Sequence, residues 1–194
     1  MIQQDNLLSR LRAETTELHR AIEATPLSAI IVSPAITRQD YSRYLQKMLL
    51  LHSAVETAVF PSLQNIVSGL EQRRKSGAIR KDLAALSEEE FTSGHSFLEK
   101  EDHTDPAFNL GIMYVTEGSS LGGQFILKNI KAALGADAPS GFLNVYGSQT
   151  GSRWKEFLED LGRYAATQDE AGKNRIVEGA KYGFRQTLEL FSQS

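Results

Sequence analysis

The stretch from Leu110 to Lys131, LGIMYVTEGSSLGGQFILKNIK, has the apolar content of a buried helix and yet contains four glycines. Each glycine costs roughly 1 kcal/mol relative to alanine inside a helix, so the four together forfeit about 4 kcal/mol. At about 3.6 residues per turn, Gly111, Gly118 and Gly122 fall within a narrow arc of one face. Because that arc carries no side chains, either a second helix packs closely against it or a flat ligand lies on bare backbone.

The overall composition indicates a single soluble domain, residues 1–194, in the cytoplasm. A chain of 194 residues is long enough to bury about 70% of its unfolded surface around one core. Its 21 basic and 24 acidic residues give a net charge of −3, which provides no general attraction to nucleic acid or to anionic membranes. The N-terminus is polar and no run of about 18 apolar residues occurs, so we expect neither a secretion signal nor a membrane span.

The absence of cysteine limits the chemistry that the chain can carry out by itself. It excludes disulfides, thiolate chemistry, iron–sulfur clusters and cysteine-ligated zinc. A redox reaction on this chain would therefore need a bound cofactor or electrons from outside.

A histidine lies beside the apolar stripe of the first predicted helix, residues 5–24. Glu23 follows His19 by four residues and Arg12 precedes it by seven, so the three side chains share one face. A carboxylate at that spacing can accept a hydrogen bond from Nδ1 and leave Nε2 free to bind a metal. The alternative is a half-exposed histidine on an ordinary salt-bridged helix face.

Apolar residues recur at three- and four-residue spacing along most of the chain, which predicts an all-α fold. Thr37-x-x-Asp40 has the form of a capping box that opens a helix through Phe60, and Pro61 should stop or kink that helix. We expect residues 62–75 to continue as a helix whose end, EQRRKSG, is a solvated charged turn. The expected architecture is a compact bundle or globin-like packing of about seven to nine helices.

The main rival metal site combines His95, Glu99 and His103, which follow one another at four-residue intervals. They would share one face if a single helix ran through all three. Asp105 and Pro106 are strong signals for the start of a new helix, however, so we expect His103 to lie in a turn.

Three motifs, in order along the chain, resemble those of the heme oxygenase family and together span nearly the whole sequence. The stretch YVTEGSSLGGQFILKNI is similar to the family's distal helix, in which a Gly-x-x-x-Gly-Gly-Gln core lies over the heme face. The matching residues are Gly118, Gly122, Gly123 and Gln124. The resemblance implies an all-α, heme oxygenase-like fold with heme sandwiched between a proximal and a distal helix.

The first helix, LRAETTELHRAIE, resembles the proximal helix of the family, whose histidine ligates the heme iron. This resemblance implies that His19 is the axial ligand, that Glu23 pairs with it and that Arg12 contacts the heme propionates. The stretch RIVEGAKYGFRQTLELF is similar to the family's last helix, which implies that Phe184 and Phe191 wall the heme pocket.

The segment GFLNVYGSQTGSRWKEF is most similar to the soluble bacterial members, including those paired with phytochromes. It implies a second propionate contact at Lys155, with Arg153 as a further candidate. The basic residue that the family carries one turn after the Lys155 position is missing, since Glu159 falls there.

One departure from the animal-type enzymes concerns the residue after the first distal glycine. Those enzymes carry an aspartate that holds the water network of the distal pocket, whereas this chain has Ser119. A serine hydroxyl can anchor a water but cannot act as a charged base. The resemblance therefore implies that catalysis depends on Ser119 together with Gly118, Gly122 and Gly123.

The implied reaction converts heme, oxygen and external electrons into biliverdin, carbon monoxide and ferrous iron, with heme as both cofactor and substrate. The implied partners are an external electron donor, either a ferredoxin or a flavoprotein reductase, and a bilin acceptor such as a phytochrome. Two alternatives stay open. One is a non-catalytic heme carrier or sensor on the same fold, and the other is a thiamin-degrading or carboxylate-bridged metal enzyme of the same helical superfamily.

Overall fold

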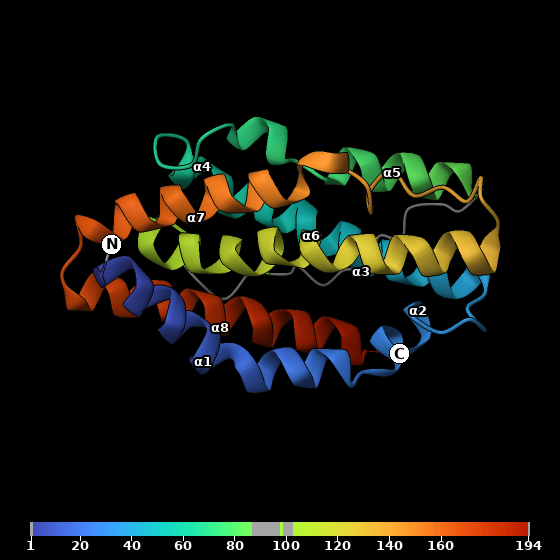
Figure 1. The fold of residues 1–194 in the computed structure, drawn as a ribbon, viewed down its shortest axis with the longest axis horizontal. Helices are drawn as coiled ribbons and strands as arrows, with labels where there is room; N and C mark the ends of the chain where they lie inside the picture. The colour runs from blue at the N-terminus through green and yellow to red at the C-terminus, as the bar shows by residue number, and fades with distance from the viewer. Residues whose placement is uncertain (1, 87–97, 99–102, 194) are drawn as a thin grey trace.

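The computed structural model describes residues 2–86, 98 and 103–193, and these residues form helices without any β-strand (Figure 1). The predicted all-α fold is confirmed. None of the helices in the described part of the chain is both long and apolar enough to cross a membrane. The elements in chain order are α1 (Ile2–Glu23), α2 (Pro26–Ile31), α3 (Arg38–Ala54), the π-helix η1 (Val55–Val59), α4 (Phe60–Leu63), the 3₁₀-helix η2 (Leu70–Arg73), α5 (Ser76–Ala85), α6 (Pro106–Leu134), the 3₁₀-helix η3 (Gly147–Gln149), α7 (Thr150–Ala166) and α8 (Glu170–Ser192).

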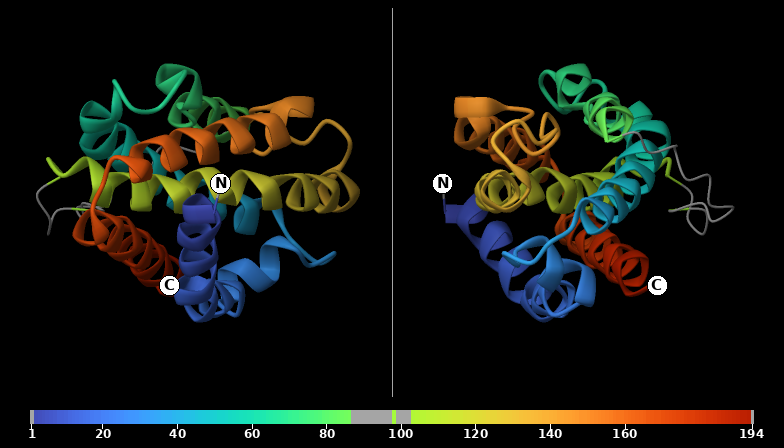
Figure 2. Two further views of the ribbon diagram at one scale, coloured as in Figure 1. Left: turned by 60° about the vertical axis from the view of Figure 1, so that its left-hand side comes forward. Right: turned by 90° about the vertical axis from the view of Figure 1, so that its right-hand side faces the viewer.

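Helix α6, which contains the glycine-rich stretch, runs through the middle of the molecule (Figure 1). The turned views in Figure 2 place α7 on one side of it and α1 with α8 on the other. Its apolar side chains Leu110, Ile112 and Met113 have no solvent exposure. The first three turns of this helix are buried on nearly all sides, which explains why apolar residues occupy most of their positions.

Local signals in the sequence fix the ends of the long helices. The Thr37 side chain accepts from the backbone N–H of Asp40 while the Asp40 carboxylate accepts from the backbone of Thr37, so the predicted capping box is present. Asp105 caps α6 and Pro106 occupies its first turn. Gly135, with a φ of +105°, ends α6 in a backbone conformation that other residues rarely adopt.

The helix predicted over residues 62–75 is wrong. The chain accommodates Pro61 by a π-turn over residues 55–59 and continues only to Leu63. Beyond that point, the Asp160 carboxylate accepts hydrogen bonds from the backbone and the hydroxyl of Ser68, and Gly69 adopts a left-handed φ of +60°. These distant contacts replace the hydrogen bonds that a continuous helix would have made.

Helices α6 and α8 cross so closely that their glycines are required for the contact. A Cβ atom on Gly111 would lie 2.0 Å from the carbonyl oxygen of Ile176, and one on Gly179 would lie 1.9 Å from that of Phe108. Neither position can hold a side chain at this separation. Gly111 is therefore a helix-packing residue, as the simpler of the two interpretations of the glycine arc required.

Candidate functional site

A cavity of about 700 Å³ opens beside α6 beyond its crossing with α8. This volume is within the range of about 300–1,000 Å³ that is usual for small-molecule and cofactor sites. Its walls come from α1, α2, α3, α6, α8 and the first turns of α7, and they are mainly apolar. The lining residues are Arg12, His19, Ile22, Glu23, Ser28, Ile31, Val32, Tyr44, Met48, Leu51, Tyr114, Val115, Thr116, Gly118, Ser119, Leu121, Gly122, Phe125, Ile126, Trp154, Phe184, Thr187 and Phe191.

The four glycines of α6 lie in three environments, of which the first is the contact of Gly111 with α8. Gly118 and Gly122 line the cavity, and a Cβ atom on Gly122 would meet nothing within 4 Å, whereas one on Gly118 would touch the Trp154 ring at 3.5 Å. Gly123 faces away from the cavity, because its Cβ would lie 3.2 Å from the carbonyl oxygen of Leu143. The structure thus brings Gly118 and Gly122 to the cavity, whereas Gly123 packs against the loop that contains Leu143.

His19 lies on the wall that α1 contributes. Its Nδ1 is 3.5 Å from Oε1 of Glu23, and its ring meets the edge of Phe184 at a centroid distance of 5.8 Å. The side chains of His19 and Glu23 are 58% and 66% exposed, so their contact contributes little to stability. What the pair provides is orientation: with Nδ1 toward the carboxylate, Nε2 is the nitrogen available to bind a metal.

Arg12 and Tyr114 form a polar region of the cavity wall. Burial raises the pKa of Tyr114, and the neighbouring Arg12 guanidinium partly opposes that rise. Arg12 is the only arginine or lysine among the described residues that line the cavity. Sequence reasoning missed Tyr114, although it precedes Gly118 by one helical turn and therefore shares its face.

The structure does not bring Lys155 and Arg153 to the cavity. The Lys155 side chain is 79% exposed with its Nζ 3.8 Å from Glu159, and Nη1 of Arg153 lies 3.2 Å from Glu156. The physical reason is the helix period, since the neighbouring Trp154 points from α7 toward α6 and successive residues turn by about 100°. A propionate contact at either residue has no support from its position.

Ser119 lines the cavity next to Gly118, and its hydroxyl donates to the backbone carbonyl of Thr116 at 2.8 Å. Its single proton is therefore in use, and its oxygen is free to accept a hydrogen bond. In this arrangement the serine can hold a water as an acceptor, but it has no proton of its own to give.

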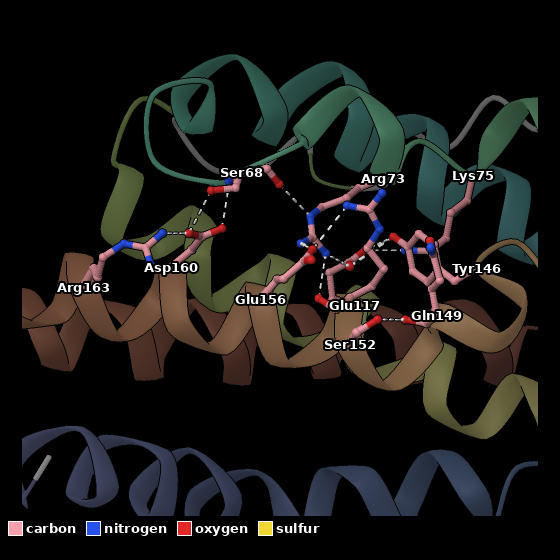
Figure 3. Close-up of polar contacts among 11 residues, drawn as sticks. Ser68, Arg73, Lys75, Glu117, Tyr146, Gln149, Ser152, Glu156, Asp160 and Arg163 are labelled. Carbon is pink, nitrogen blue, oxygen red and sulfur yellow. Dashed lines mark hydrogen bonds and ion pairs between the residues drawn. The ribbon is translucent and has the colours of Figure 1, made fainter.

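A buried ion cluster lies beside α6 (Figure 3), and its members Arg73, Lys75, Glu117 and Tyr146 do not line the large cavity. Glu117, which is 2% exposed, accepts from Nη1 of Arg73 at 2.6 Å, from Nζ of Lys75, and from the Tyr146 hydroxyl at 3.0 and 3.1 Å. The prediction that EQRRKSG forms a solvated turn is wrong, since Arg73 and Lys75 are 1% and 2% exposed. A lone carboxylate inside the apolar stretch of α6 was the signal that such partners had to exist.

The cluster keeps Glu117 ionised. Burial alone would raise the pKa of its carboxyl, but Lys75 and Arg73 outweigh burial and lower the pKa below the ordinary value of 4.5. Because folding lowers the pKa of Glu117, its ionised carboxylate stabilises the fold fully at pH values above the ordinary pKa of 4.5. This stabilisation is lost as the pH falls through the lowered pKa of the folded protein.

We expect Glu117→Ala to lower the free energy of unfolding by about 3–5 kcal/mol, because it removes the carboxylate that both buried cations share and leaves Arg73 only the half-exposed Glu156, 3.6 Å away. Urea denaturation followed by circular dichroism measures this change. Glu17→Ala is the matched control, since Glu17 pairs with Arg20 at an 84% exposed site and should change stability by less than about 0.5 kcal/mol. Equal effects in the two variants would contradict the account of the cluster.

The rival metal site receives no support from the described residues. Both ring nitrogens of His103 are engaged, Nδ1 with Asn109 at 3.1 Å and Nε2 with the backbone oxygen of Leu98 at 2.9 Å. His103 lies in a turn, as predicted, while His95 and Glu99 fall outside the described residues. In the part of the chain that the structure covers, no group of three or more histidine and acidic residues could hold a metal ion.

The fold and the cavity together define an all-α protein in which a histidine-bearing helix faces a glycine-bearing helix across a pocket of cofactor size. The chain belongs to the heme oxygenase family, whose family model matches residues 5–193. As a member of that family, it is a heme-degrading oxidoreductase. The resemblance seen in the sequence motifs is thereby confirmed.

Individual relatives agree with this assignment. The chain is 27% identical over 193 residues to the heme oxygenase PigA of Pseudomonas aeruginosa, covering 95% of this chain and 91% of that one. The solved heme oxygenase of Neisseria meningitidis superposes with a TM-score of 0.74 at 23% identity, covering 97% of this chain and 93% of the other. Heme oxygenase-1 of the cyanobacterium Synechocystis, solved in complex with heme, gives a TM-score of 0.78 at 18% identity over 96% and 90%.

Proposed function

We propose that this chain binds heme in the cavity between α1 and α6, with His19 as the iron ligand, and opens the macrocycle to biliverdin with release of carbon monoxide and ferrous iron. The single observation that supports it best is the shared cavity of His19, Gly118 and Gly122, three residues from two helices far apart in the sequence. It combines a metal-binding nitrogen with a backbone surface that a flat ring can approach closely.

The residues present fit heme. Gly122 offers bare backbone with open space in front of it, and Glu23 orients the imidazole of His19. Arg12 and Tyr114 offer a cation and a hydroxyl to the propionates, as recognition of a carboxylate requires. Phe184 and Phe191 supply apolar surface on α8. When bound, heme supplies the iron that activates oxygen and is also the molecule that is cleaved.

Each of the chain's own groups has a distinct task in this proposal. Glu23 holds the His19 ring, so that the imidazole binds as a neutral ligand with a fixed orientation. Gly122 leaves open space on the α6 wall of the cavity, where a small molecule and a water could be accommodated beside the bound group. Ser119 accepts a hydrogen bond from that water while its own proton stays with Thr116.

The electrons come from a partner, because the chain contains no cysteine to carry an iron–sulfur cluster or a thiol couple. We propose a ferredoxin or a flavoprotein reductase in this role. A cytoplasmic location and a bilin acceptor such as a phytochrome complete the proposal, and both rest on the sequence resemblance to the soluble bacterial members.

Reconstitution followed by reduction tests the proposal against the non-catalytic carrier or sensor. The purified chain should bind one heme and develop a Soret band, and a reductant in air should then convert that band into the absorption of biliverdin with release of carbon monoxide. A stable heme complex that yields no bilin under these conditions would favour the carrier. No Soret band at all would favour the thiamin-degrading or metal-carboxylate alternatives.

We expect Arg12→Glu to weaken heme binding by roughly 10- to 100-fold, because it replaces a charge-assisted hydrogen bond to a propionate with repulsion. It should also change the proportions of the biliverdin isomers, since that contact fixes the rotation of the ring in its own plane. Heme titration and chromatography of the product measure the two effects.

Lys155→Glu provides the matched charge reversal for Arg12. Because Lys155 lies outside the cavity wall, affinity and isomer proportions should stay close to those of the unmodified chain. If Lys155→Glu reduced affinity as much as Arg12→Glu, the sequence-based prediction of a propionate contact at Lys155 would be right and the geometric interpretation wrong.

A further inference from the structure

The large cavity has exposed apolar side chains on part of its wall. In the part of the chain that the structure describes, the exposed large hydrophobic residues are Val32, Leu121 and Phe125, with 42%, 45% and 66% of their surface in solvent. All three line this cavity, Leu121 and Phe125 from α6 and Val32 from the end of α2. Single exposed apolar residues are common on protein surfaces, but a group of them on one cavity indicates a surface that a ligand or a partner covers.

The glycine surface of α6 lies between two aromatic side chains. At about 100° per residue, Tyr114, Gly118 and Phe125 fall within about 40° of one another around the helix. Tyr114 and Phe125 are eleven residues apart, so the helical rise separates them by about 16 Å along the axis. A flat ligand that lies on the bare backbone of Gly118 and Gly122 therefore has one ring at each end of it.

The end of this surface at Tyr114 is packed and polar. The Tyr114 ring lies 5.4 Å from that of Trp154, which stacks at 5.7 Å on Phe157, a residue without solvent exposure. Arg12 lies beside Tyr114 and also lines the cavity. A cation and a phenol suit the carboxylates of a ligand, so the edge of a ring that carries no carboxylate would point along α6 toward Phe125.

The end at Phe125 is open and apolar. Phe184 and Phe191, the phenylalanines that α8 contributes to the same cavity, are each only 8% exposed, because the protein itself already covers them. Phe125 leaves 66% of its surface in solvent. Hydrophobic stabilisation grows with the apolar area removed from water, so a ligand in this cavity gains more by covering Phe125 than by contacting either of the other two rings.

We propose that Phe125, with Leu121 and Val32 beside it, is a specificity-determining residue that covers the carboxylate-free edge of bound heme, where the two vinyl-bearing pyrroles lie. The inference rests on the proposed function, because it needs heme in the large cavity. Arg12 and Tyr114 hold the propionate edge at one end of the glycine surface, and Phe125 holds the apolar edge at the other. The two contacts together fix where the ring lies along α6.

Release of ferric heme to an excess of heme-free globin tests this contact without any turnover. Phe125→Ala should raise the release rate by roughly 10-fold, because it removes most of the apolar area that the ligand covers at this end. Phe125→Leu should raise it less, since leucine still covers part of the ring. Leu127→Ala is the matched control, because Leu127 is a partly buried residue of α6 that packs on the core and is not part of the cavity wall. It should lower stability and leave the release rate unchanged.

Deuteroheme, in which hydrogens replace both vinyl groups, tests which edge of the ring Phe125 covers. The unmodified chain should release it several-fold faster than heme, because it lacks the groups that Phe125 contacts. In Phe125→Ala the two ligands should be released at similar rates, since the substitution and the missing vinyl groups affect one contact and their effects do not add. In Leu127→Ala the difference between the ligands should stay as large as in the unmodified chain.

Equal heme release from Phe125→Ala and the unmodified chain, or a difference between the ligands that persists in Phe125→Ala, would overturn the proposal. A dimer of the heme-free chain that Phe125→Ala dissociates in sedimentation, with no effect on heme release, would show that a second copy covers this surface instead. The Soret band of the unmodified chain is recorded first: its absence would contradict the proposed function and the inference with it, whereas a normal band with unchanged release rates would contradict the inference alone.

Discussion

His19→Ala should abolish biliverdin formation and the spectrum of a histidine-ligated heme. Of the described residues that line the cavity, His19 alone is a histidine, and its Nδ1 lies 3.5 Å from the carboxylate of Glu23. Alanine removes the nitrogen that would bind iron, so neither the ligand nor its orientation can be replaced by the remaining wall. The measurement is a single turnover of heme-loaded protein, with absorption spectra recorded before reduction and biliverdin quantified afterwards.

Two controls separate ligation from a general loss of structure. Glu23→Ala should be milder, because loss of the partner of a metal-binding histidine typically costs about 10–100-fold in affinity or activity. His52→Ala removes a histidine that is 3% exposed and packs on Phe142, outside the cavity wall, so it should retain the histidine-ligated spectrum. Full activity in His19→Ala would show that the proximal assignment is wrong.

Gly122→Leu and Gly118→Leu should reduce the biliverdin yield far more than Ser119→Ala. A leucine at position 122 points into the cavity, where a Cβ meets nothing within 4 Å, and would take the space of ligand and water. At position 118 the side chain would also press on Trp154. Ser119→Ala removes a hydroxyl whose proton is already bound to Thr116, so substantial turnover should remain. Single-turnover yields of the three variants measure the difference.

The matched control for these substitutions is Gly151→Leu, since Gly151 is an exposed glycine of α7 with nothing within 4 Å of its Cβ position. It should give a normal yield. If Gly118→Leu and Gly122→Leu also gave normal yields, those glycines would serve only helix packing, and the proposed position of heme would lose its main support.

The sequence was sufficient where a function depends on residues close together in one helix. Helical spacing placed Arg12, His19 and Glu23 on one face of α1, and the structure has all three on the cavity wall. The same spacing put Gly111, Gly118 and Gly122 on one arc of α6. It could not distinguish them, because what faces each glycine is decided by α8, which touches α6 at Gly111 and has moved away at Gly122.

Contacts between distant segments were beyond sequence reasoning. Arg73 and Lys75 look like part of a solvated charged turn until Glu117, 44 and 42 residues away, is known to lie beside them. Likewise, nothing local in residues 62–75 shows that Asp160 binds Ser68 and ends the helix. In both cases a buried side chain satisfies a group that the local sequence would have left to solvent.

The central claim, that heme lies between His19 and the glycine wall of α6, is tested most directly by a crystal structure of the heme-bound chain. We expect iron bound by Nε2 of His19, the backbone of Gly118 and Gly122 over the opposite face of the ring, and a propionate beside Arg12. Iron held by any other side chain, or a ring bound outside this cavity, would contradict it.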